Sequence, residues 1–131
     1  MIRRPPRSTL DRSSAASDVY KRQAFMSARL SSISDNKLGG WYSYRSSKTA
    51  LNMLIKTLSV ELSYSNKNAI CVGLHPGTVD TQLSKPFTQK IKNKKIFTKD
   101  EAAEFLIEVL NNIDHNDSGS IIDWQGEKVP Y

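Results

Sequence analysis

Two side chains that could move a proton, Tyr44 and Lys48, lie four residues apart in the chain. Residues at this spacing share one face of a helix, and an apolar helical pattern follows them. A phenol ordinarily loses its proton at about pH 10, and a nearby ammonium favours the phenolate, which lowers the cost of proton transfer near neutral pH. The pair could therefore act as a general acid or base, although the same spacing also occurs by chance on solvated helix faces.

A second candidate region is the turn that follows an apolar run. Residues 69–74 (AICVGL) are almost continuously apolar, as is typical of a strand covered on both faces. Pro76 and Gly77 then end the strand. Cys71 lies inside the run, so we expect a buried thiol and not a nucleophile or a ligand.

The stretch 39–52 (GGWYSYRSSKTALN) resembles the active-site segment of the short-chain dehydrogenases/reductases, in particular the branch of C-factor-like proteins and related carbonyl reductases. The turn at Pro76 and Gly77 fits the same family. This resemblance runs from about residue 24 to residue 131, roughly the second half of such an enzyme. The glycine-rich turn that holds the cofactor pyrophosphate in this family is not found among the six glycines. We therefore expect a fragment whose first half is missing.

The resemblance implies an enzyme that exchanges hydride between NAD or NADP and a small carbonyl or alcohol substrate. Tyr44 would be the acid or base on the substrate oxygen, and Lys48 would lower its pKa and bind the nicotinamide ribose. The nicotinamide site would be shaped by Pro76, Gly77, Val79 and Thr81, with backbone groups of Val79 at the carboxamide. The sequence does not distinguish NAD from NADP, because the residue that contacts the ribose 2′ position would lie in the missing half. A homodimer of the full-length parent is also left open.

The serine that polarises the substrate oxygen departs from the family pattern. Members commonly carry two serines at the strand end, of which the second is catalytic. In this sequence the position of that second serine is occupied by Ala28. Ser27 lies beside it, and Ser32 has the usual spacing of twelve residues before Tyr44. Both serines remain candidates.

The first 23 residues show neither strand alternation nor a helical stripe. They resemble translated sequencing-adaptor sequence, so we expect a non-native or disordered basic segment at 1–23 and the family domain at 24–131. A targeting peptide and a nucleic-acid-binding arm are the alternatives. A secretory signal is excluded because there is no apolar core of about 7 residues or more, and we expect a cytoplasmic protein.

Most of the positive charge belongs to that segment. It holds six basic and two acidic residues, a net charge of +4 out of the chain's +6. The remainder therefore does not predict a nucleic-acid partner, and no apolar run approaches the ~18 residues that would cross a membrane. The two histidines, His75 and His115, have no Cys or carboxylate cluster at metal spacing. A non-enzymatic signalling protein or basic binding module remains the alternative to an enzyme.

The elements that must position these residues alternate along the chain. We expect a strand ending at 25–30, a helix over 42–64, a strand over 69–74, a helix that opens with a capping box at Thr98 and Glu101, and a strand over 121–124. The lysine-rich stretch 82–97 between them is read as a solvated lid over the substrate, with a nucleic-acid patch as the alternative. This order predicts an α/β fold with a parallel sheet. The family resemblance implies that it is the C-terminal part of a Rossmann-like sheet.

Overall fold

The computed structural model describes residues 21–88 and 95–131. The expectation for residues 1–20 therefore lies outside the described residues, and so does the middle of the lysine-rich stretch, 89–94. Among the residues described, no helix combines the length and the apolar character that crossing a bilayer requires. These residues also contain no group of three or more His, Cys, Asp or Glu side chains that could hold a metal ion.

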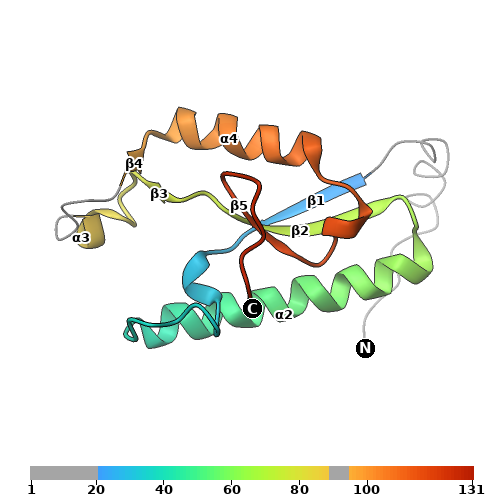
Figure 1. Ribbon diagram of the computed structural model, residues 1–131, viewed down its shortest axis with the longest axis horizontal. Helices are drawn as coiled ribbons and strands as arrows, with labels where there is room; N and C mark the ends of the chain where they lie inside the picture. The colour runs from blue at the N-terminus through green and yellow to red at the C-terminus, as the bar shows by residue number, and fades with distance from the viewer. Residues whose placement is uncertain (1–20, 89–94) are drawn as a thin grey trace, which may run out of the picture.

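A three-stranded parallel sheet forms the centre of the structure, in the order β1-β2-β5. The strands are β1 (Lys21–Met26), β2 (Ala69–His75) and β5 (Ile121–Asp123). The first crossover is the long helix α2 (Tyr42–Ser65), and the second contains α4 (Lys99–Asn112). Figure 1 shows α2 on one face of the sheet and α4 on the other. The predicted parallel α/β arrangement is confirmed.

The central strand β2 is apolar throughout because each of its faces packs against a helix. Alternate residues of the strand, Ile70, Val72 and Leu74, join Val109 and Ile113 of the α4 side in one core cluster. Cys71 points the other way and packs with Ile55 of α2 and with Ile121 and Val129. The thiol is buried, as predicted.

Gly73 lets α2 approach the sheet closely. A Cβ atom at this position would collide with Ile121 Cδ1 and would lie 3.1 Å from Ile55 Cδ1. A larger residue would therefore push the helix or β5 away from the strand. The carboxyl end of β2 depends on this packing.

Helix α2 begins after three successive residues in the left-handed region, Gly39, Gly40 and Trp41. No side chain caps the helix at Trp41. Instead the Arg45 guanidinium donates to the carbonyl oxygens of Gly39, Gly40 and Leu30, at 2.9–3.1 Å. The turn and the first helical residues are thus joined by one side chain.

The connection between β2 and α4 contains short elements. They are β3 (Thr78–Val79), α3 (Lys85–Thr88) and β4 (Ile96–Phe97), and β3 and β4 pair in parallel. Helix α4 then starts with the predicted capping box, in which Thr98 and Glu101 exchange hydrogen bonds. A 3₁₀ turn, η2 (His115–Asp117), leads from α4 toward β5.

The first strand lies earlier in the chain than predicted. Its end at Met26 falls within the expected range 25–30, but β1 covers Lys21–Met26, and residues 27–30 lie beyond it, where the 3₁₀ turn η1 (Arg29–Ser31) begins. Pairing with β2 sets this position, since Lys21 lies opposite Ala69 and Met26 opposite Leu74. Residues 21–23, which were assigned to the non-native segment, are therefore part of the sheet.

Candidate active site

Tyr44 and Lys48 lie on the first two turns of α2, on the side of the helix that meets the end of β1. The Lys48 ammonium donates a hydrogen bond to the carbonyl oxygen of Met26, at 2.8 Å. Its nitrogen lies 5.8 Å from the centroid of the Tyr44 ring. The Tyr44 side of the pair is open to solvent, with 37% of the residue exposed. The structure therefore brings together the two groups that the sequence singled out for proton transfer.

Partial burial raises the pKa of the Tyr44 phenol above its ordinary value. We expected the opposite direction, on the ground that Lys48 would stabilise the phenolate. The ammonium is instead directed at the Met26 carbonyl. Desolvation of the phenol is thus the cause of its raised pKa.

Ser27 follows β1 directly and is buried. Its backbone amide donates to the carbonyl oxygen of Leu74, so it lies at the carboxyl end of the paired strands. The hydroxyl donates to Asn52 Oδ1 of α2, at 2.5 Å. The neighbouring Ala28 is also buried and carries no hydroxyl.

Ser32, the other candidate, faces a different part of the molecule. Its hydroxyl donates to the carbonyl oxygen of Tyr131, at 3.2 Å, and accepts from the backbone amide of Asp35. The amide of Ser34 donates to the same Tyr131 carbonyl. Ser32 thus ties the loop after η1 to the C-terminal segment, whereas Ser27 is bonded to the helix that carries Tyr44.

The proposed nicotinamide-binding turn leaves the carboxyl end of β2. Pro76, Gly77, Val79 and Thr81 are all half-buried. Gly77 has a φ of +77°, and a Cβ there would lie 2.8 Å from the Phe97 ring. A glycine is therefore required for both the backbone conformation and the packing. Because Ser27 pairs with the end of β2, this turn and the Lys48 contact lie at the same rim of the sheet.

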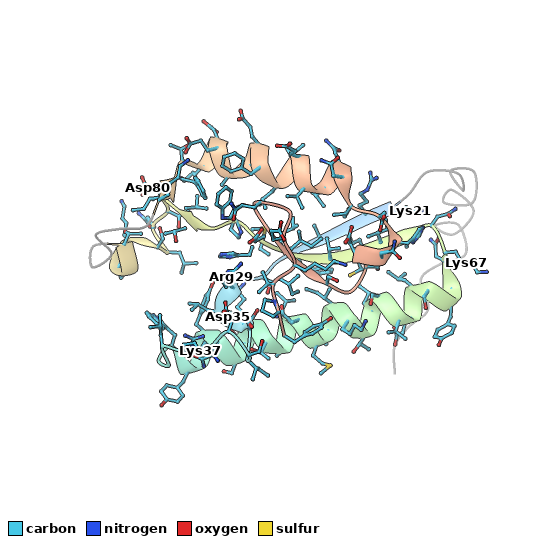
Figure 2. The ribbon with its side chains drawn as sticks, viewed as in Figure 1. Lys21, Arg29, Asp35, Lys37, Lys67 and Asp80 are labelled. Carbon is cyan, nitrogen blue, oxygen red and sulfur yellow. The ribbon has the colours of Figure 1, made fainter. Side chains whose placement is uncertain are left out.

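A charged cluster at this rim was not predicted from the sequence. The Arg29 guanidinium bonds the carboxylate of Asp123, at 3.0 Å, and that of Asp35, at 3.2 Å. Figure 2 shows Arg29 and Asp35 close together, left of the centre of the view, and Lys21 and Lys67 at its right. Asp123 is 94 residues away from Arg29 in the sequence, so no local spacing could indicate that pair.

Asn52 and Ser31 were also missed. Asn52 Nδ2 donates to Ser31 Oγ at 2.6 Å, and the Ser31 hydroxyl donates to the Ala28 carbonyl. One signal was available, because Asn52 lies four positions after Lys48 and therefore continues the helix face of Tyr44 and Lys48.

Two cavities lie on either side of the sheet, and neither is lined by Tyr44 or Lys48. One, of about 330 Å³, is bounded by α4 and the turn after β5 and includes Phe105 and Trp124. The other, of about 300 Å³, lies between α2 and β1 and is mostly apolar. Tyr44 and Lys48 therefore lie outside both of these cavities.

Known proteins with similar sequences and structures show which family this site resembles. The model of the family described as short chain dehydrogenase matches residues 29–92. The C-signal protein of Myxococcus xanthus is 31% identical over 113 residues, which are 86% of this chain and 63% of that protein. The 1-hydroxy-2-glutathionyl-2-methyl-3-butene dehydrogenase of Rhodococcus sp. (strain AD45) is 36% identical over 94 residues, 72% of this chain and 39% of that enzyme.

Solved structures give the same result. The NADPH-bound carbonyl reductase from chicken fatty liver is 33% identical and superposes with a TM-score of 0.71, over 84% of this chain and 42% of that one. The carbonyl reductase Sniffer of D. melanogaster is 26% identical with a TM-score of 0.75, over 91% of this chain and 46% of that one. The chain thus spans less than two thirds of the length of these relatives. In sequence and in fold, the chain is similar to the short-chain dehydrogenases/reductases.

Proposed function

We propose that this chain supplies the proton-transferring half of an oxidoreductase that moves hydride between NAD or NADP and a small carbonyl or alcohol. The observation that carries the proposal is the position of Tyr44 and Lys48. Both lie on one helix face at the carboxyl end of parallel strands, where Lys48 is held by the Met26 carbonyl. Ligands of open α/β sheets bind at that end.

The residues at this rim fit the nicotinamide end of such a cofactor. Lys48 offers an ammonium that can donate to ribose hydroxyls, and the turn at Pro76 and Gly77 presents half-buried backbone at the same rim of the sheet. Val79 and Thr81 complete the proposed lining. When bound, the nicotinamide ring supplies or accepts the hydride.

The side chains of this chain handle the proton. In the reducing direction Tyr44 donates its proton to the carbonyl oxygen as the hydride reaches the carbon, and in the oxidising direction the phenolate takes the proton back. Burial raises the pKa of Tyr44, which keeps the proton in place until it is needed. The positive charge of Lys48 then stabilises the phenolate that remains.

A hydroxyl that donates to the substrate oxygen would complete the site, and we assign Ser27 in preference to Ser32. Ser27 is bonded to Asn52 on the helix of Tyr44, whereas Ser32 is bonded to the Tyr131 carbonyl. To reach a substrate the Ser27 hydroxyl has to rotate away from Asn52.

The test of the proposal uses the full-length protein that contains this chain. Tyr44→Phe removes one hydroxyl, so carbonyl reduction with NADH or NADPH should fall by at least about 10²-fold while the fold persists. Tyr42→Phe is the matched control, because Tyr42 lies on the same helical turn and is 87% exposed. Turnover in Tyr44→Phe equal to that of Tyr42→Phe would refute the assignment.

We also propose that the predicted domain part 24–131, extended by the residues 21–23 that pair with β2, is the C-terminal half of the domain, and that the 131 residues alone are inactive. The described residues include no glycine-rich turn before a helix that could hold a pyrophosphate. The outer edge of β1 has no strand beside it in the sheet of the described residues. Calorimetric titration of the purified chain should show no saturable binding of NAD(H) or NADP(H) at about micromolar concentrations. Tight binding would contradict this part of the proposal.

A non-enzymatic signalling role is the second candidate. It is favoured by the similarity to a protein named C-signal. The two candidates differ in one measurement, since a signalling role that needs no chemistry survives Tyr44→Phe. Cytoplasmic location and a homodimer of the full-length protein remain predictions.

A further inference from the structure

Asn52 lies on the same face of α2 as Tyr44 and Lys48, each four residues after the one before. Only 7% of Asn52 is exposed, and the apolar residues Leu51 and Ile55 flank it on the helix. A buried amide is costly unless its donor and acceptor are both used. An apolar residue would pack at this position without that requirement.

Both ends of the Asn52 amide are used, and they bond to residues on either side of Ala28. Oδ1 accepts from the Ser27 hydroxyl, and Nδ2 donates to the Ser31 hydroxyl. The Ser31 hydroxyl in turn donates a hydrogen bond to the Ala28 carbonyl oxygen, which also accepts one from the Ser31 amide. The strand end and the turn η1 are therefore joined through a single side chain.

Three other residues of α2 contact the same segment, but each bonds only a backbone carbonyl of it. Arg45 donates to Leu30, Lys48 to Met26 and Thr49 to Ser31. These bonds hold the path of the backbone, whereas the Asn52 bonds fix the orientation of two side chains. Ser27 and Ser31 are both buried, so water cannot readily take the place of the amide.

We propose that Asn52 is a positioning residue that holds residues 27–31 at a fixed distance and orientation relative to the phenol of Tyr44. The inference rests on the proposed function, since it assigns Asn52 an effect on that site. Its physical basis is that loss of the amide leaves two buried hydroxyls without their partner and lets the turn shift. A misplacement of about 1 Å near reacting groups can lower a rate by about 10²-fold.

The experiment compares three variants of the full-length protein. Asn52→Leu removes both hydrogen bonds at nearly the same volume, and Asn52→Asp keeps the acceptor but loses the donor to Ser31 when the carboxyl is ionised. Ser59→Ala is the control, because Ser59 is a buried polar residue of the same helix whose hydroxyl donates within the helix, to Lys56. Turnover, the KM for substrate and the amide exchange of Ser31 and Ser32 are measured for each.

We expect Asn52→Leu to lower kcat by about tenfold or more with less than about a threefold change in KM, and to raise the amide exchange of Ser31 and Ser32 about tenfold. Asn52→Asp should show the same changes to a smaller extent. If Asn52→Leu matches Ser59→Ala in turnover, the proposal is overturned even where exchange rises. If the wild-type protein reduces no carbonyl, the proposed function fails, and unchanged exchange in Asn52→Leu would show separately that Asn52 does not hold the turn.

Discussion

The ammonium of Lys48 donates to the carbonyl oxygen of Met26 at 2.8 Å, so the lysine links the helix of Tyr44 to the last residue of β1. A lysine that served only as a charge beside the phenol would not need this bond. The contact gives Lys48 two tasks, which are to hold the strand end and to present positive charge at the rim of the sheet.

Lys48→Met should therefore weaken both cofactor binding and turnover in the full-length protein. We expect kcat/KM to fall by about 10²-fold, because the charge that stabilises the phenolate and the strand-end bond are lost together. Lys56→Met, two turns further along α2 at an exposed position, controls for the loss of a lysine from this helix. Steady-state kinetics with equal losses in both variants would contradict the role of Lys48.

The serine assignment predicts a difference between two alanine variants. Ser27→Ala should lower turnover by about 10²-fold, as expected for the loss of one donor to the reacting oxygen. Ser32→Ala should cost little, because its hydroxyl is bonded to the C-terminal segment. Adding Ala28→Ser to Ser27→Ala should restore part of the rate if the family register falls on Ala28. Small and equal effects of Ser27→Ala and Ser32→Ala would show that neither serine is the donor.

The Tyr44 phenol should titrate above its ordinary pKa of about 10. The raised pKa favours the neutral phenol in the folded state, so the associated stability is present below about pH 10 and is lost as the pH rises through the folded-state pKa. The difference in tyrosinate absorbance between wild type and Tyr44→Phe gives the midpoint. N-acetyltyrosinamide is the reference, and a midpoint at or below that of the reference would contradict this prediction.

The two ion pairs of Arg29 should differ in their contribution to stability. The side chain of Asp123 is 4% exposed and also accepts from the amides of Gln125 and Glu127, whereas that of Asp35 is 40% exposed. We expect Asp123→Ala to lower the free energy of unfolding by about 3 kcal/mol and Asp35→Ala by less than about 1 kcal/mol. Urea unfolding of the two variants tests the difference, and equal losses would contradict it.

The sequence predicted the helices and strands that depend on interactions between residues close together in the chain. Helix α2 begins at the expected residue, the capping box of Thr98 and Glu101 forms, and the run 69–74 is the buried central strand. Each of these depends on spacing or on contacts within a few residues. The pairing of Tyr44 with Lys48 also follows from helical spacing alone.

The parts that could not be predicted depend on distant residues. The position of β1 is decided by its pairing with β2, which placed residues 21–23 in the sheet against expectation. The bonds from Asn52 to Ser27 and Ser31, and from Arg29 to Asp123, join residues 21 to 94 positions apart. The raised pKa of Tyr44 also differs from the expectation, because it comes from burial of the phenol, which the sequence does not show.

The side chain of Arg45 also determines how steadily the phenol is held. Helix ends commonly fray, and Tyr44 is the third residue of a helix that no side chain caps. Arg45, in the first turn of the helix, holds that end by donating hydrogen bonds to the carbonyl oxygens of Gly39, Gly40 and Leu30. An arginine that takes no part in the proposed chemistry would thus set how long the general acid stays in its reactive position.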